Sequence, residues 1–336
     1  GADSIHFNIS GDGPHTITVN ANMALPEITD PVHIDGYTEP GASPNTLGPG
    51  AGTNAVLQVE INGNNAPGPT LFSAVLTISA GNSSVRGLGI RNGDDYGILL
   101  TGAGGNVVAG CFLGTDLSGM TVPPTTSFYP IYVKESPNST IGGTDPAARN
   151  LIAGESQGIR IEGTGTLVQG NLIGTNADGT EALPNQVGIQ LAIASENTIG
   201  GSSPAARNVI SGNNQAGVSL IAQSSQNVIS GNYIGVDVTG QAPLGNGREG
   251  VFVWDSSMEN TLGGDVPGAR NVIADNGQGT GLAGVSIGLG ADDNTVQGNY
   301  IGVAADGLTP LPNAAEGIRV YDSRSTTIGG DVATAG

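Results

Sequence analysis

Cysteine, lysine and histidine are nearly absent from this 336-residue sequence. A single cysteine, Cys111, excludes an internal disulfide, and a single lysine, Lys134, leaves arginine to supply the other positive charges. The three histidines, His6, His15 and His33, all lie near the N-terminus. Any reaction farther along the chain must therefore proceed without histidine as its acid or base.

Positive charge and long apolar runs are also scarce. Lysine and arginine total 10 against 29 aspartates and glutamates, which gives a formal net charge of −19 at pH 7. Nucleic acids and anionic membrane surfaces both need clustered cations, so neither is predicted as a partner. No apolar run approaches the roughly 18 residues that a membrane span requires, which predicts no membrane insertion. Neutral, cationic and calcium-bridged ligands stay open.

The sequence is instead rich in glycine, with 57 residues, and it contains an internal repeat. The nonapeptide NVISGNYIG at 227–235 has close copies in which Leu113, Ile173 and Ile301 take the place of Ile234, at steps of 60, 61 and 67 residues. A second motif, NTIGGSSPAARNVISG and its copies, interleaves with the first. The repeat is therefore a pair of coils of chain.

Short Gly-apolar-x-apolar segments occur once in each coil. Their starts lie 28 to 34 residues apart, and each segment alternates with a period of two. Three short strands per turn without a helical pattern are typical of a parallel β-solenoid. Each coil has an inward row of Ile, Val and Leu that it cannot bury alone, so the coils must stack. The segments are GILL at 97, PIYV at 130, GIRI at 158, GIQL at 188, GVSL at 217, GVFV at 250, GVSI at 284 and GIRV at 317.

Asparagine recurs in two registers of the repeat. A side-chain amide both donates and accepts, so amides one coil apart can hydrogen-bond along the stack where the backbone turns a corner. Cys111 occupies an asparagine slot, so it is predicted as a substituted ladder position rather than a nucleophile. The first register holds Asn150, Asn171, Asn208, Asn232, Asn271 and Asn299, and the second holds Asn106, Asn197, Asn227, Asn260 and Asn294.

Residues 1–73 differ from the repeats. They alternate as strands do but are broken by Pro and Gly, as in LPEITDPVHIDGYTEPGASPNT. The first edge of a solenoid needs a cover, because bare N–H and C=O groups would pair with another chain. We therefore predict an N-terminal cap with the first strands over 1–73, and coils over 74–336 that continue from it as one domain.

The opening segment, the IGTD turns and the TIGG…ARNVISGN repeats together resemble the bacterial right-handed parallel β-helix repeat proteins of the pectin-lyase-like superfamily. The resemblance covers essentially the whole chain. It implies an all-β fold with a single right-handed parallel β-helix, and a protein that is secreted or lies on the cell surface. The functions it implies range from polysaccharide lyases and hydrolases to adhesins and stalks. The Asp-Pro-His signature of mannuronan epimerases is absent from the sequence.

The variable residue of each Gly-apolar-x-apolar segment faces outward, so these residues form a stripe along one face. Only 13 residues are aromatic, yet seven of them, from Tyr96 and Phe128 to Tyr321, lie on or beside this strand. Exposed rings stack on the C–H faces of sugars, which predicts a carbohydrate groove here. The alternative is a solvated sheet face without a ligand. The predicted substrate-binding residues are Asp95, Tyr132, Gln190, Phe252, Trp254, Arg319 and Tyr321.

Charged residues on adjacent coils of this stripe are candidates for catalysis. As a lyase, the protein would use Lys134 as the base, with its neutral form favoured by Arg160, while Arg160 neutralises a uronate carboxylate. As a hydrolase, it would pair Glu135 with Glu162 or Asp95. The alternative is a salt-bridge ladder between strands. The predicted catalytic residues are Lys134, Glu135, Arg160 and Glu162.

Aspartates recur in a turn of successive coil pairs, at Asp116, Asp178, Asp237 and Asp306. Calcium needs six to eight oxygen ligands, whereas each turn offers one carboxylate. The turns are therefore predicted as Asx-turns, in which the side chain accepts from its own backbone. No metal site is predicted, and calcium stays open as the only cofactor.

A repeated arginine precedes a ladder asparagine in a PxARN context. The three copies are Arg149, Arg207 and Arg270. Their matching contexts, two coils apart, predict that they bind loop carbonyls or the aspartates of the GGTD and GGD turns, rather than a ligand.

Two functions from different classes fit these features. The first is a secreted polysaccharide-binding or polysaccharide-degrading protein, a lyase or glycoside hydrolase if it is an enzyme, with polysaccharide as its partner. The second is a non-catalytic adhesin or stalk module of a larger bacterial surface protein. A final coil needs a cover, which implies a homo-oligomer or a longer parent chain.

Overall fold

A computed structural model describes residues 1–19, 25–63, 74–122 and 129–330. Strands dominate these residues, and within them no helix is long and apolar enough to cross a membrane. The helical elements of the described residues are four single 3-10 turns, η1 (Gly36–Thr38), η2 (Pro146–Ala148), η3 (Pro204–Ala206) and η4 (Pro267–Ala269).

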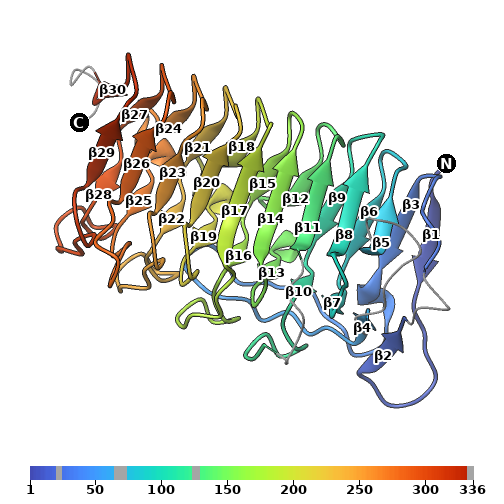
Figure 1. The fold of residues 1–336 in the computed structure, drawn as a ribbon. Coiled ribbons are helices and arrows are strands. Elements are labelled where there is room, and N and C mark those ends of the chain that lie inside the picture. Colours follow the sequence, from blue (N-terminus) through green and yellow to red (C-terminus); the bar gives the residue numbers. More distant parts are fainter. Residues whose placement is uncertain (20–24, 64–73, 123–128, 331–336) are drawn as a thin grey trace.

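The strands form three parallel sheets that run the length of a rod (Figure 1). From β3 onward, neighbours in a sheet are three strands apart along the chain, so each coil supplies one strand to each sheet. This arrangement confirms the predicted all-β fold, a single right-handed parallel β-helix.

The bounds of the strands are as follows. Sheet A contains β1 (Asp3–His6), β3 (Val32–Asp35), β6 (Ser84–Arg86), β9 (Val107–Ala109), β12 (Thr140–Gly142), β15 (Leu167–Gln169), β18 (Thr198–Gly200), β21 (Val228–Ser230), β24 (Thr261–Gly263), β27 (Thr295–Gln297) and β30 (Thr327–Ile328). Sheet B contains β2 (His15–Thr18), β4 (Val59–Asn62), β7 (Gly89–Arg91), β10 (Phe112–Leu113), β13 (Leu151–Ile152), β16 (Leu172–Ile173), β19 (Val209–Ile210), β22 (Tyr233–Ile234), β25 (Val272–Ile273) and β28 (Tyr300–Ile301). Sheet C contains β5 (Ala74–Ile78), β8 (Tyr96–Thr101), β11 (Tyr129–Lys134), β14 (Gln157–Glu162), β17 (Val187–Ala192), β20 (Val218–Ile221), β23 (Val251–Val253), β26 (Val285–Gly288) and β29 (Ile318–Tyr321).

The inward side chains of the three sheets fill one continuous core. Leu113, Ile173 and Ile234 lie in one register of sheet B and are fully buried, as the repeat predicts. The core rows are Ile, Val and Leu throughout, because β-branched and γ-branched side chains fill the space inside a small coil. A coil outside the stack would expose its row to water, so the coils are stable together rather than singly.

The first asparagine register forms an unbroken ladder, as predicted. From Asn150 to Asn299, each side-chain Nδ2 donates to the Oδ1 of the next asparagine at 2.8 to 3.1 Å. The second register forms a ladder from Asn197 to Asn294, at 2.9 to 3.0 Å. Asn106 is separate from that ladder, because its Nδ2 donates to the hydroxyl of Ser136 instead.

A third ladder was not predicted. It runs from Asn185 through Asn213, Asn246 and Asn276 to Asn313, with Nδ2 to Oδ1 distances of 2.8 to 3.1 Å. The signal for it is an asparagine a few residues before each sheet C strand, within segments of differing length and sequence. Three corners of the coil therefore carry buried amides whose hydrogen bonds run parallel to the strand ladders.

The segment 36–58, which we call the strap, crosses the outer face of sheet B. It makes hydrogen bonds with successive coils, from Tyr37 Oη to the Gly110 carbonyl at 2.7 Å and from Thr53 N to the Ala177 carbonyl at 2.7 Å. The strap belongs to the stretch predicted as an N-terminal cap. That stretch also supplies β1 to β4, which pair in parallel within sheets A and B.

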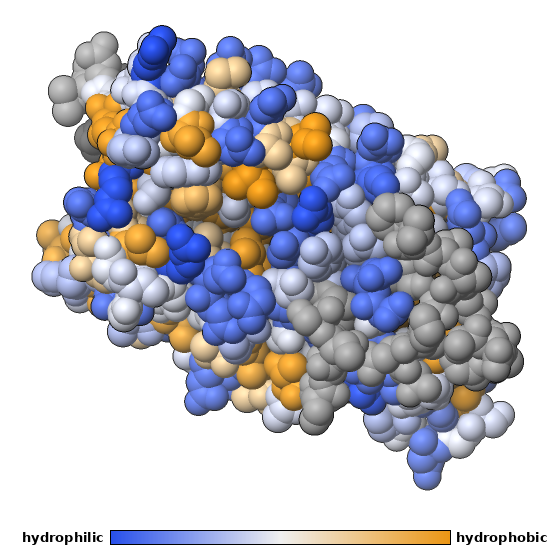
Figure 2. Space-filling view, viewed as in Figure 1, coloured by the Kyte–Doolittle hydropathy of each residue, from blue (hydrophilic) through white to orange (hydrophobic). Residues whose placement is uncertain are grey.

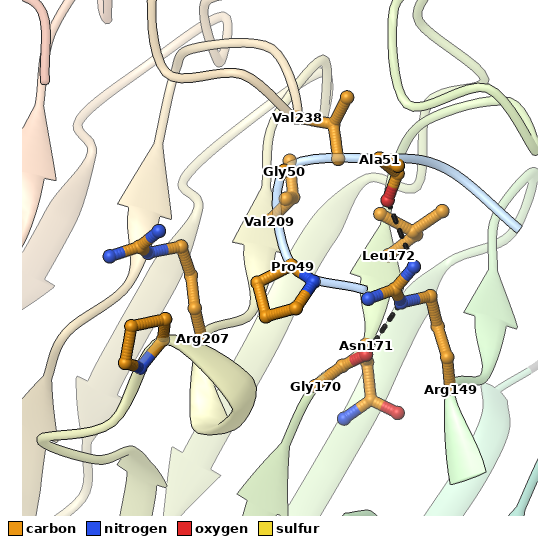
Figure 3. A pocket seen from close by; sticks show the side chains of 11 residues that line it. Pro49, Gly50, Ala51, Arg149, Gly170, Asn171, Leu172, Arg207, Val209 and Val238 are labelled. Carbon is orange, nitrogen blue, oxygen red and sulfur yellow. Dashed lines mark hydrogen bonds between the residues drawn. The ribbon is translucent and has the colours of Figure 1, made fainter. Parts of the chain in front are cut away.

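The repeated arginines bind loop carbonyls, as predicted. The Nε atoms of Arg207 and Arg270 donate to the carbonyls of Gly231 and Gly298, at 3.1 and 2.9 Å. Arg149 makes the same kind of bond and also donates to the carbonyls of the strap at Gly48, Ala51 and Gly52 (Figure 3). Arg149 is only 9% exposed, and this burial lowers its pKa.

Candidate functional site

The outward residues of sheet C form the single column that the repeat predicts. The register of the strands aligns them one above another, because successive strands pair without a shift. Apolar partners on either side of each column residue point into the core. The column runs Leu99, Tyr132, Arg160, Gln190, Ser219, Phe252, Ser286 and Arg319.

Three tyrosines pack together where the column begins, and we call them the tyrosine cluster. The ring of Tyr96 lies 5.0 Å from that of Tyr132 and 5.6 Å from that of Tyr129, centroid to centroid. Tyr132 is only 4% exposed, so its ring is part of a packed cluster rather than an open surface for stacking. Phe128, also predicted beside this strand, lies outside the described residues.

Glu162 joins the tyrosine cluster to the charged residues of the next coils. It accepts a hydrogen bond from Tyr132 Oη at 2.6 Å and another from Arg160 Nε at 2.8 Å. Arg160 Nη1 also donates to Gln190 Oε1 at 2.9 Å. Burial, together with the bond to Glu162, raises the pKa of Tyr132. Burial alone would lower the pKa of Arg160, but the bond to the Glu162 carboxylate outweighs it and raises the pKa. Both groups therefore stay protonated at neutral pH.

The remaining predicted catalytic residues lie beside this network. Lys134 is the register partner of Glu162 on the neighbouring strand. Glu135 is exposed and follows β11 at a corner where its backbone is left-handed, with φ of 54°. Asp95 immediately precedes β8, and its carbonyl accepts from Tyr129 N at 2.9 Å. The structure thus joins Tyr132, Arg160, Glu162 and Gln190, and it places Glu135 and Asp95 at the two ends of the strands.

A second aromatic group, which we call the aromatic stack, lies toward the C-terminal end of the same face. The rings of Phe252 and Trp254 are 5.1 Å apart with 16° between their planes, and those of Trp254 and Tyr321 are 6.3 Å apart with 15° between them. Gly288 lies beneath the indole, and a Cβ atom there would come within 2.3 Å of Trp254 Cζ3. The missing side chain lets the indole lie against the sheet.

A groove of about 580 Å³ extends over the aromatic stack, within the size range of ligand sites. A shallower hollow of about 200 Å³ continues from it toward Gln190, and both share Phe252, Arg248 and Glu249 in their lining. The strands of sheet C cross the middle of Figure 2, where hydrophobic and hydrophilic residues lie side by side toward the C-terminal end. The groove therefore follows the column from β17 to β29.

The arginines of the groove each face a carboxylate. Arg248 Nε lies 3.6 Å from Glu249 Oε2, and Arg319 Nη2 lies 2.5 Å from Glu316 Oε2. Glu249 is only 4% exposed, so Arg248 balances a buried charge. The groove thus offers apolar ring faces bordered by two ion pairs.

Other hollows and turns do not form a site. The cavity beneath the strap measures about 10 Å³, room for one water molecule at most (Figure 3). The aspartates of the turns accept from their own backbone, for example Asp237 Oδ1 from Gln241 N at 3.1 Å. In the second turn this acceptor is Asn176 rather than the predicted Asp178. Over the described ranges, no group of three or more His, Cys, Asp or Glu residues is placed to hold a metal ion.

Sequence reasoning found the outward residues of the groove but missed three of its parts. The period of two predicted Gln190, Phe252 and Arg319, whereas Gly288 and the partners Glu249 and Glu316 were not singled out. Gly288 has one sequence signal, because it ends a strand at the position where the next coil has Tyr321. The two glutamates lie in the variable segments before the strands, which carry no regular pattern.

Comparison with known proteins supports the fold. The family described as right handed beta helix region matches residues 73–266. No curated protein matches the chain. Among solved structures, the A-module of the Azotobacter vinelandii mannuronan C-5 epimerase AlgE4 is similar at 12% identity and a TM-score of 0.54, with 94% of this chain and 84% of that chain covered. A mutant of the periplasmic alginate epimerase AlgG is similar at 13% identity and a TM-score of 0.50, with 93% and 67% covered. Identities this low establish a common fold and nothing more.

Proposed function

The chain belongs to the family of right-handed β-helix regions, and on this premise we propose that it binds a polysaccharide along the outward face of sheet C. The aromatic stack carries the proposal. Three near-parallel rings that border a groove are what the apolar faces of successive sugar rings pack against. The two similar structures, named as epimerases of mannuronan and alginate, support a polysaccharide ligand.

The groove also has polar groups that suit a sugar chain. Gln190 lies at one end and Arg319 with Glu316 at the other, so donors and acceptors for hydroxyl groups border the rings. Strands in a sheet lie about 4.8 Å apart, so the five coils from β17 to β29 span about 19 Å. A ligand of this length is a chain of several sugars rather than a single one.

Binding is tested by electrophoresis of the protein through gels that contain soluble polysaccharides, neutral and uronate. We expect retardation by at least one of them and an affinity about tenfold or more lower for Trp254→Ala, because that variant loses the central ring. Leu308→Ala is the matched control, since Leu308 is an apolar side chain 82% exposed outside sheet C. Free migration through every gel, or equal retardation of Trp254→Ala and the parent protein, would contradict the proposal.

Turnover at the network around Glu162 is the second candidate function. It is favoured by the hydrogen bonds that hold Tyr132, Arg160 and Glu162 together beside Lys134. Lys134 would act as the base of a lyase, whereas Glu162 would need to exchange its present partners to act in hydrolysis. Absorbance of unsaturated products and release of reducing ends test the two reactions. Lys134→Ala should abolish the first, and Glu162→Gln should abolish the second.

Retention without turnover would favour the adhesin or stalk alternative. In either case we propose that the protein acts outside the cytoplasm, where polysaccharides of the cell surface lie. This proposal rests on the family and on the similar structure that is named as periplasmic. Detection of the native protein in the cytosolic fraction alone would contradict it.

A further inference from the structure

We infer that the groove over the aromatic stack takes an uncharged sugar chain rather than a polyuronate. The inference rests on the proposed function and adds the class of sugar. It follows from the way in which every arginine of this face is matched with a carboxylate, not from the rings, which would stack on either kind of sugar.

The positive charges inside the groove are neutralised within the protein. Arg319 pairs with Glu316 at 2.5 Å, and Arg248 lies 3.6 Å from the buried Glu249. Two arginines and two glutamates sum to zero formal charge. Removing Arg248 from Glu249 to bind a ligand carboxylate would leave Glu249 buried without its partner, which is strongly unfavourable.

The next part of the face has the same property. Farther along the column, Arg160 is held by Glu162 and Gln190, with its Nε and Nη1 groups already donating. An arginine that recognises a carboxylate needs two free donors in its fork. The three arginines of the column and its wall are therefore already bound to carboxylates of this chain.

The charge of the whole chain acts in the same direction. At a formal net charge of −19, the protein repels a polyanion at long range. A divalent cation could bridge two carboxylates, but the residues described by the structure hold no cluster of metal ligands. A neutral chain meets neither obstacle, because its hydroxyl groups donate to the exposed Glu316 and accept from Arg319.

Affinity electrophoresis with paired polysaccharides tests the inference. One gel series contains a neutral soluble glucan or mannan, and the other contains polygalacturonate or alginate, each at 20 mM and 500 mM NaCl. We expect at least tenfold tighter binding to a neutral chain, with little change between the two salt concentrations. Tighter binding to a polyuronate, weakened by salt, would overturn the inference and leave the proposed function intact. Free migration in all gels would overturn both.

A charge variant makes the test sharper. Glu316→Gln releases Arg319 from its partner, so retardation by polyuronate should rise severalfold at 20 mM NaCl relative to the parent protein. Glu181→Gln makes the same change in net charge on an exposed residue outside sheet C and should leave polyuronate retardation unchanged. Equal behaviour of Glu316→Gln and Glu181→Gln would show that the ion pair at Arg319 does not set the preference.

Discussion

Cys111 occupies a position where later coils carry asparagine, and its surroundings already suit an amide. Its backbone N–H donates to Asn150 Oδ1 at 2.9 Å, as a ladder asparagine would. Its Sγ lies 3.7 and 3.4 Å from the carbonyls of Val85 and Ala109, which match the carbonyls that Asn171 Nδ2 reaches one coil pair later. Burial raises the pKa of this thiol to about 12, so it has no reactive thiolate at neutral pH.

Cys111→Asn is therefore expected to stabilise the fold by about 1 kcal/mol, because an amide replaces a weak donor with two full hydrogen bonds. Asn171→Cys is the matched reverse change in the same column. It leaves Asn150 Nδ2 without its acceptor and should cost about 1 to 3 kcal/mol. Urea denaturation measures both, and a Cys111→Asn protein less stable than the parent would contradict the ladder interpretation of this position.

Gly288 shows how a residue with no side chain shapes the groove. Its Cβ would collide with the indole of Trp254, so Gly288→Ala is expected to tilt the ring away from Tyr321. The ring is at the surface and can move, so stability should change little while affinity for the glycan falls about tenfold. A titration of the variant checks this, and unchanged affinity would mean that the stacked geometry is not needed.

Among the longer elements, the strap gives two identical motifs different weights. Arg149 and Arg270 share the PxARN context, yet only Arg149 lies beneath the strap and donates to three of its carbonyls. Arg149→Ala leaves these buried carbonyls without donors and should cost about 3 kcal/mol or more. Arg270→Ala loses one bond to Gly298 and the stacking on Tyr300, worth about 1 kcal/mol. Equal losses in urea denaturation would show that the strap does not depend on Arg149.

The same comparison explains which elements could be predicted. The coils, the inward rows at Leu113 and Ile173 and the first ladder follow from a repeated pattern, because each coil imposes the same geometry on the next. The strap has no repeat, and its contacts join residues about a hundred positions apart, such as Ala51 and Arg149. The burial of Tyr132 was also not predicted, because it depends on how neighbouring rings pack rather than on the alternation of the strand.

At the scale of the whole molecule, the rod turns a repeat into a continuous surface. Stacking in register converts positions about 30 residues apart into neighbours, so Gln190, Phe252 and Arg319 come to lie along one groove. The same stacking concentrates aromatic rings on one face of a chain that has only 13 of them. Function then depends on which side chains occupy that face, and their paired charges favour a neutral sugar chain.

The fluorescence of Trp254 tests this claim most directly, because it is the only tryptophan in the chain. Titration of the protein with the neutral polysaccharide that retards it should shift and saturate the emission, since sugar rings displace water from the indole in the aromatic stack. The concentration at half-saturation should agree with the affinity from electrophoresis. Retardation by a polysaccharide that leaves the emission unchanged would place binding elsewhere and contradict the assignment of the groove.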